Sequence, residues 1–193
     1  MKGINNVEFH RVDFEEGNFA HVTNTLRKLH ECQNLLLLLG HTLGNPADKS
    51  RLLTNLRESM KGDDYILIGV ELFETQDADK IVRHYENEKL YGLLFNILDK
   101  LGMSRSDRVF EIEFNTDKRQ VEMRFRLQEN VELDVKGNEV EFASGEEILL
   151  ATSYKFTKRG LHDLLETTGF RIRSFLMNQE ETYALALCQT KNM

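Results

Sequence analysis

Hydrophobic positions in the first part of the chain switch between short apolar runs and stretches at helical spacing. The five consecutive leucines at residues 35–39 are too few for a stable helix and are typical of a strand buried on both faces, as in parallel sheets. Residues 7–12 and 65–72 have the character of further strands, and residues 20–32 that of a helix. Before a second helix, Asn45 is the expected N-cap and Pro46 the first helical residue. This alternation predicts a parallel α/β sheet.

The pattern changes in the middle of the chain. Residues 77–101 keep helical spacing, but Phe110, Ile112 and Phe114 then alternate with glutamates, and residues 121–127 alternate in the same way. A period of two over consecutive segments predicts an antiparallel ribbon. A further hairpin is predicted over residues 131–142, around Gly137. We therefore expect an antiparallel β lobe over residues 106–153, inserted into an α/β domain made of residues 1–105 and 154–193.

The carboxyl-terminal part returns to the α/β pattern. Thr157 is the expected cap of a helix that ends at Gly169. Strands are predicted over residues 170–176 and 182–188, with a short polar loop between them. Because a parallel pair needs a long crossover connection, so short a loop predicts an antiparallel β-hairpin.

Charge and composition exclude several classes of protein. The chain has 25 Lys and Arg against 32 Asp and Glu, a net charge of −7, and no polybasic run, so we expect no nucleic-acid partner. No apolar stretch approaches the ~20 residues that span a bilayer, so we expect no membrane association. Cys32 and Cys188 lie in apolar stretches and are predicted to be buried free thiols, which suits a cytoplasmic protein. No metal site is expected, because His30 and Cys32 have no second ligand cluster.

Candidate ligand-binding residues follow two of the predicted strands. In open α/β sheets, ligands bind beyond the carboxyl ends of the strands. Asp13 follows the first strand, and a loop from Gly40 to Asn45 follows the leucine strand. Glycine permits close backbone approach, and an ionised aspartate accepts hydrogen bonds from an amino group such as that of adenine. The alternative is that Asp13 caps the next helix and the glycine turn has only a conformational role. His41 is either a base or an incidental loop residue.

Four segments in order resemble the histidine-specific, S-adenosylmethionine-dependent methyltransferase family of the ergothioneine type. They are the strand and G-H-T-L-G-N turn of residues 35–45, the G-D-D-Y-I-L-I-G-V strand with the helix before it at residues 55–70, residues 84–98, and residues 145–156. The helix-then-hairpin order of the last strands is also similar to class I methyltransferases. The resemblance therefore implies a class I, Rossmann-like fold with an inserted antiparallel lobe.

The resemblance also implies a ligand site. Asp13, Phe14 and Gly40 would contact the cofactor S-adenosylmethionine. Three further residues would line the pocket of an amino acid or similar small amine: Asn45, Tyr85 and Ser153. No catalytic residue is assigned, because methyl transfer from a sulfonium mainly requires alignment of the reactants and exclusion of water.

Two departures from the family pattern change the expected activity. Ala151 stands where histidine-methylating members carry glutamate, so histidine is not the expected substrate. Upstream of Asp13 the only glycine is Gly3, so the glycine-rich cofactor loop is missing and the fold is expected to be amino-terminally truncated. We expect methyl transfer by this chain alone to be impaired. The alternative is a non-catalytic, truncated relative that binds a ligand or a partner chain.

Missing strands would leave the leucine strand at an exposed edge of the sheet. Exposed apolar edges recruit partners, and a symmetric contact needs only one self-complementary surface. We therefore expect a homodimer through this edge. The alternative is that the strand at residues 7–12 pairs with the leucine strand within one chain.

Overall fold

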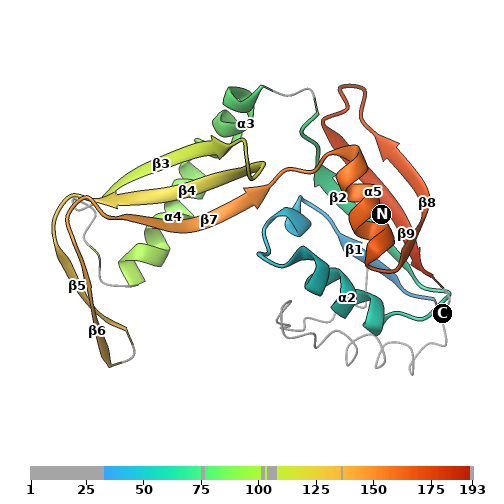
Figure 1. Ribbon diagram of the computed structural model, residues 1–193, viewed down its shortest axis with the longest axis horizontal. Coiled ribbons are helices and arrows are strands. Elements are labelled where there is room, and N and C mark those ends of the chain that lie inside the picture. The colour runs from blue at the N-terminus through green and yellow to red at the C-terminus, as the bar shows by residue number, and fades with distance from the viewer. Residues whose placement is uncertain (1–32, 75–76, 101–102, 104–107, 136, 192–193) are drawn as a thin grey trace, which may run out of the picture. The chain divides into compact units, whose positions relative to one another are not determined.

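The computed structural model describes residues 33–74, 77–100, 103, 108–135 and 137–191 (Figure 1). The chain divides into two compact units, of which the first comprises residues 1–72 and 157–193 and the second residues 73–156. The strand and helix expected before residue 33, with Asp13, Phe14 and Cys32, lie outside the described residues.

The described sheet of the first unit is mixed. Across the sheet its strands are, in order, β1 (Leu35–Leu38), β2 (Tyr65–Glu71), β9 (Tyr183–Thr190) and β8 (Phe170–Met177). β1 and β2 are parallel, whereas β9 runs antiparallel to both β2 and β8. The parallel pair and the carboxyl-terminal hairpin are thus confirmed. Alternate side chains of β2 and β9 are fully buried, which is the reason these segments form central strands.

Two helices of the first unit begin at side-chain caps. In α5 (Lys158–Thr167), the Thr157 side chain accepts the Gly160 N–H, as predicted. In α2 (Lys49–Ser59), however, the cap is Asp48, whose carboxylate accepts the Arg51 N–H at 2.8 Å. The prediction of Asn45 as the N-cap was therefore wrong. Asn45 instead ends a short 3-10 turn, η1 (Thr42–Gly44), and the chain needs three more residues before the helix begins.

The second unit combines helices with antiparallel strands. Its helices are α3 (Ala78–Tyr85) and α4 (Glu88–Lys100). Its strands are β3 (Arg108–Asn115), β4 (Gln120–Leu127) and β7 (Glu147–Tyr154), which form one sheet in that order, and β5 (Val131–Val135) and β6 (Asn138–Phe142), which form a separate hairpin. Both the antiparallel ribbon and the hairpin around Gly137 are confirmed.

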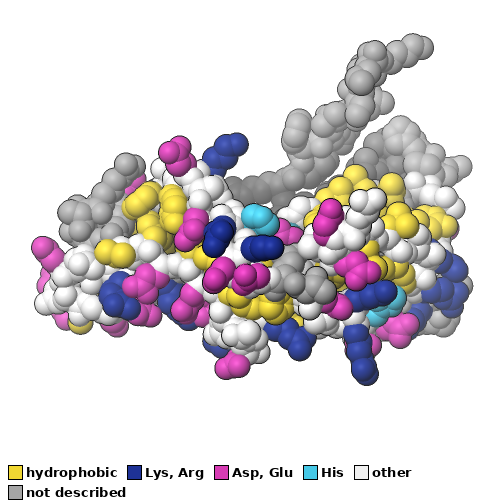
Figure 2. Space-filling model, turned by 90° about the horizontal axis from the view of Figure 1, so that it is seen from above, with side chains coloured by type: hydrophobic (Ala, Val, Ile, Leu, Met, Phe, Trp, Pro, Cys, Tyr) yellow, Lys and Arg dark blue, Asp and Glu magenta, His cyan; other side chains and the backbone are white. Residues whose placement is uncertain are grey.

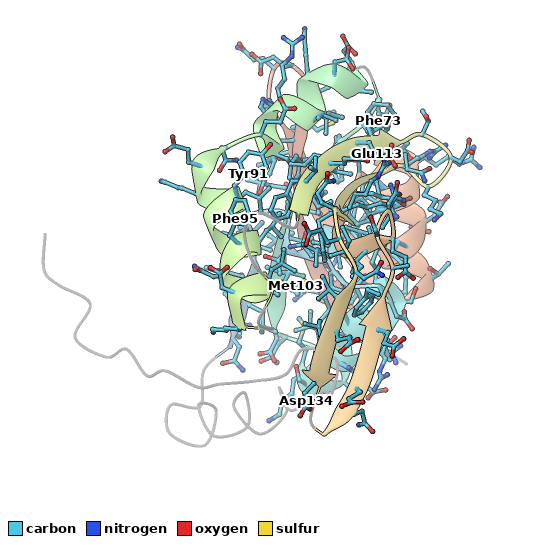
Figure 3. The ribbon with its side chains drawn as sticks, turned by 90° about the vertical axis from the view of Figure 1, so that its left-hand side faces the viewer. Phe73, Tyr91, Phe95, Met103, Glu113 and Asp134 are labelled. Carbon is cyan, nitrogen blue, oxygen red and sulfur yellow. The ribbon has the colours of Figure 1, made fainter. Side chains whose placement is uncertain are left out.

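The helices belong to this unit because their apolar faces pack on the sheet. Ile81 and Leu94 form one buried cluster with Val121 and Met123 of β4. In Figure 3, Tyr91 and Phe95 extend from α4 toward the sheet. The Phe95 ring packs edge-on against the Phe110 ring of β3, with 4.7 Å between the ring centroids. The lobe expected over residues 106–153 therefore lies within a larger compact unit that starts at Phe73.

The opposite side of this sheet is charged. Arg124 of β4 pairs with Glu113 of β3 and with the buried Glu122. Arg126, two residues along, pairs with Glu111 and Glu147 on the flanking strands. These pairs account for the charged positions of the alternating pattern, because one face of the sheet packs on the helices and the other carries the ion pairs.

Surface charges of both signs are interspersed on the face shown in Figure 2. Within the described ranges, no helix is long and apolar enough to cross a membrane. The described residues also include no group of three or more His, Cys, Asp or Glu side chains that could hold a metal ion. Cys188 is buried and free, as predicted, and its burial raises the pKa of the thiol to about 12.

Candidate functional site

The loop that follows β1 presents open backbone. Gly40 has φ +70°, and a Cβ placed on it would meet no atom within 4 Å. Such a position suits glycine conformationally and allows a ligand to approach the main chain closely. This is the carboxyl end of a parallel strand, where ligands of α/β sheets bind. The loop therefore leaves the main chain open at Gly40, and the contact of Gly40 with a cofactor stays a prediction.

His41 anchors this loop to the neighbouring strand. The backbone N–H of His41 donates to the Gly69 carbonyl at 3.2 Å, and the ring nitrogen Nδ1 accepts the backbone N–H of Glu71 at 2.9 Å. Nδ1 therefore carries no proton in this arrangement. The sequence left open whether His41 is a base or an incidental loop residue. The two hydrogen bonds instead indicate a structural role, in which His41 holds the loop against β2.

Asn45 lies at the other end of the same loop. Its N–H donates to the Thr42 carbonyl at 3.2 Å, and its side chain is exposed. Gly40 and Asn45 thus belong to one short loop, and their contact with a common ligand stays a prediction. Asp13 and Phe14, the other residues expected at the cofactor, lie outside the described residues.

Tyr85 and Ser153 meet in the second unit. The Tyr85 Oη donates to the Ser153 Oγ at 2.8 Å. Tyr85 is the last residue of α3, while Ser153 is opposite Val121 in the β4–β7 register and is 3% exposed. The expected proximity of these two residues is therefore confirmed. Asn45 belongs to the first unit, so a pocket shared by all three remains a prediction.

Lys155 completes this cluster and was not anticipated as a site residue. Its Nζ donates to the Tyr85 Oη at 2.6 Å, and it is only 1% exposed. A lysine is rarely buried unless its ammonium group has hydrogen-bond partners, so the bond to Tyr85 is part of what allows Lys155 to be buried here. The sequence feature that could have indicated Lys155 is its position two residues after Ser153, because residues two apart along an extended chain lie on the same face.

The polar cluster borders an apolar one. Tyr85 and Ala151 both pack against the buried group that contains Ile81 and Met123. Ala151 lies opposite Met123 in the strand register, two residues before Ser153 on the same face of β7. Ser153, Tyr85 and Ala151 thus bring a hydroxyl, a phenol and a methyl group to this part of the second unit.

Comparison with known proteins identifies the family. The family described as histidine-specific methyltransferase, SAM-dependent, matches residues 5–190. The chain belongs to this family. The match extends over both units, so the fold and the site residues can be interpreted within one family of methyltransferases.

Within this family, the histidine N-alpha-methyltransferase of Mycolicibacterium smegmatis is 28% identical over 189 residues, which cover 91% of this chain and 56% of that protein. The chain thus spans about half the length of this curated relative. Solved structures with similarity include an S-adenosylmethionine-dependent methyltransferase from Clostridium acetobutylicum, with a TM-score of 0.44 at 8% identity over 82% of this chain and 58% of that chain. Another is the amino pentose methyltransferase CalS10 from Micromonospora echinaspora, with a TM-score of 0.37 at 6% identity over 98% of this chain and 100% of that chain.

Proposed function

We propose that this chain takes part in the transfer of a methyl group from S-adenosylmethionine to the nitrogen of an amino acid or similar small amine. The family match supplies the reaction class. The similarity to a histidine N-alpha-methyltransferase supports the substrate class, and the observation that carries the proposed place of the substrate is the hydrogen bond between Tyr85 and Ser153. These two residues are 68 positions apart in sequence, and we propose that both line the substrate pocket.

The proposed cofactor contacts are Gly40, Asp13 and Phe14. Gly40 fits this role because its backbone is open and lies at the carboxyl end of β1. When bound, S-adenosylmethionine supplies an electrophilic methyl group on a sulfonium. The loop can hold such a ligand through main-chain contacts, because a glycine there presents no side chain to obstruct them.

The proposed substrate contacts are Asn45, Tyr85 and Ser153. All three have neutral polar side chains, which can orient the groups of an amino acid without taking part in bond making. The substrate nitrogen that receives the methyl group must offer its lone pair, so it reacts as a neutral amine. It releases a proton to water after it is methylated. Alignment of that lone pair is the main contribution expected from the protein.

The substrate is proposed to be an amino acid other than histidine. Ala151 offers a methyl group where histidine-methylating members carry a carboxylate, so a ring N–H has no charged partner there. Its packing against Met123 leaves that part of the site apolar.

The test combines cofactor binding with methyl transfer. The purified chain is titrated calorimetrically with S-adenosylhomocysteine and assayed for transfer of labelled methyl to a set of amino acids. We expect cofactor binding at micromolar concentration, impaired amino-acid methylation by this chain alone, and loss of the remaining methylation in Ser153→Ala. Ser174→Ala is the matched control, because Ser174 is an exposed serine on β8. A folded chain that binds no S-adenosylhomocysteine would contradict the proposal.

A further inference from the structure

The geometry points to Lys155 as a positioning residue that sets the direction of a hydrogen-bond relay through Tyr85 to Ser153. The relay makes Ser153 a donor, so the substrate presents a hydrogen-bond acceptor at this position: a carboxylate oxygen or an unprotonated ring nitrogen. This inference rests on the proposed function, because it names the substrate group that the same cluster recognises.

The first link of the relay has only one possible direction. A lysine ammonium has three donors and no acceptor. Its contact with the Tyr85 Oη at 2.6 Å must therefore be donated by Lys155. The phenol oxygen accepts this bond and keeps its single proton for a different partner.

The second link passes this direction on to Ser153. The phenol proton is donated to the Ser153 Oγ at 2.8 Å. The serine oxygen then acts as an acceptor, which leaves its own proton to be donated. Among the described residues, Tyr85 is the partner that the structure gives to the Ser153 hydroxyl, so a ligand is a suitable recipient of that proton.

The relay is held in place before any ligand binds. Lys155 and Ser153 are 1% and 3% exposed. The Lys155 N–H donates to the Arg119 carbonyl at 2.7 Å, directly after β7, and Ser153 is fixed in the β4–β7 register. Side chains ordered in this way lose little further entropy on binding.

The direction of these hydrogen bonds decides which group of an amino acid can bind at Ser153. A protonated amino group has only donors, so it cannot accept the Ser153 proton, whereas a carboxylate or an unprotonated ring nitrogen can. The acceptor end of the substrate is therefore placed at Ser153. The amine that receives the methyl group must lie elsewhere in the pocket.

Calorimetry on the full chain tests this assignment with four proteins: the wild type, Lys155→Met, Tyr85→Phe and the double variant. The ligands are histidine, histamine, which lacks the carboxylate, and phenylalanine, which lacks the ring nitrogen. We expect Lys155→Met to weaken binding of the acceptor-bearing ligands roughly tenfold or more, as for a lost hydrogen bond to a charged group. Because Lys155 acts through Tyr85, its replacement should have almost no further effect in the Tyr85→Phe background.

The ligand arms distinguish the two acceptors. Much weaker binding of histamine than of histidine assigns the carboxylate to Ser153, and much weaker binding of phenylalanine assigns the ring nitrogen. Equal binding of all three would overturn the inference, as would an equal effect of Lys155→Met in both backgrounds. Lys155→Arg keeps the donors and should restore part of the affinity.

Failure of the proposed function gives a different result. The proposed function is overturned if the chain binds no S-adenosylhomocysteine and transfers no methyl group, whereas the assignment of the acceptor group is overturned if the wild-type chain binds none of the three ligands. The relay itself is then judged from the free energies of unfolding of the same four proteins in urea. Coupling between Lys155 and Tyr85 in that cycle supports the first link, and additive effects overturn it.

Discussion

At the scale of single residues, we expect Ala151 to influence substrate preference. It is two residues before Ser153 on β7 and packs against the cluster around Ile81 and Met123. Its methyl group has no capacity to accept a hydrogen bond from a substrate N–H.

The replacement Ala151→Glu should increase the affinity for histidine. A carboxylate two residues before Ser153 can accept a ring N–H, and a hydrogen bond to a charged group contributes about 1–3 kcal/mol. Titration calorimetry with histidine measures the change. Leu149→Glu is the control, because Leu149 is 47% exposed on the same strand and should leave the affinity unchanged. An equal effect of both replacements would indicate a general charge effect.

At the scale of elements, the beginning of α2 depends on one side-chain cap. Asp48→Ala removes the acceptor of the Arg51 N–H and should lower the free energy of unfolding by about 1 kcal/mol. Asn45→Ala should have a much smaller effect, because Asn45 precedes the helix and its side chain is exposed. Urea unfolding of both variants measures the difference. The reverse order would show that the helix begins at Asn45 after all.

Close packing around β2 leaves no room for a side chain at Gly69. A Cβ on Gly69 would lie 2.4 Å from the Tyr183 hydroxyl and 3.2 Å from side-chain atoms of Leu185 and Leu39. Gly69→Ala should therefore destabilise the protein by about 1–3 kcal/mol, as for an overpacked site.

The matched control for Gly69→Ala is Gly92→Ala in α4, where a Cβ would meet nothing within 4 Å. Because alanine is the better helix former, this variant should be as stable as the wild type or up to about 1 kcal/mol more stable. Thermal and urea unfolding measure both changes. A neutral Gly69→Ala would mean that Tyr183 moves aside at no cost.

At the scale of the whole molecule, the homodimer through the leucine strand remains a prediction. β1 is at one end of the described strand order, and Leu35, Leu37 and Leu39 are 58%, 60% and 41% exposed. Apolar side chains gathered on one strand favour a partner surface. Light scattering at micromolar concentration should give twice the mass of one chain, and Leu37→Lys should reduce it to a single chain. Leu176→Lys is the control, because Leu176 is 62% exposed on β8. A monomeric wild type would contradict the prediction.

The sequence by itself determined the features that depend on local pattern. A leucine run too short for a helix became β1, and a period of two became β3 and β4. The five-residue loop after β8 could connect only antiparallel strands, because a parallel pair needs a long crossover. Thr157 was recognisable as a cap, since a hydroxyl before a helical pattern accepts an N–H of the first turn. Each of these features is decided by residues close together in the chain.

Tertiary structure alone decided which surfaces met. An amphipathic helix can cover any apolar face, so periodicity could not show that α3 and α4 pack on β4. It also could not show that Lys155 would be buried against Tyr85, 70 positions earlier in the chain. Asn45 and Asp48 are both good helix caps, and the short 3-10 turn before α2 selected Asp48. These outcomes depend on burial and on partners distant in sequence, because a polar group is tolerated inside a protein only where the fold supplies its hydrogen bonds.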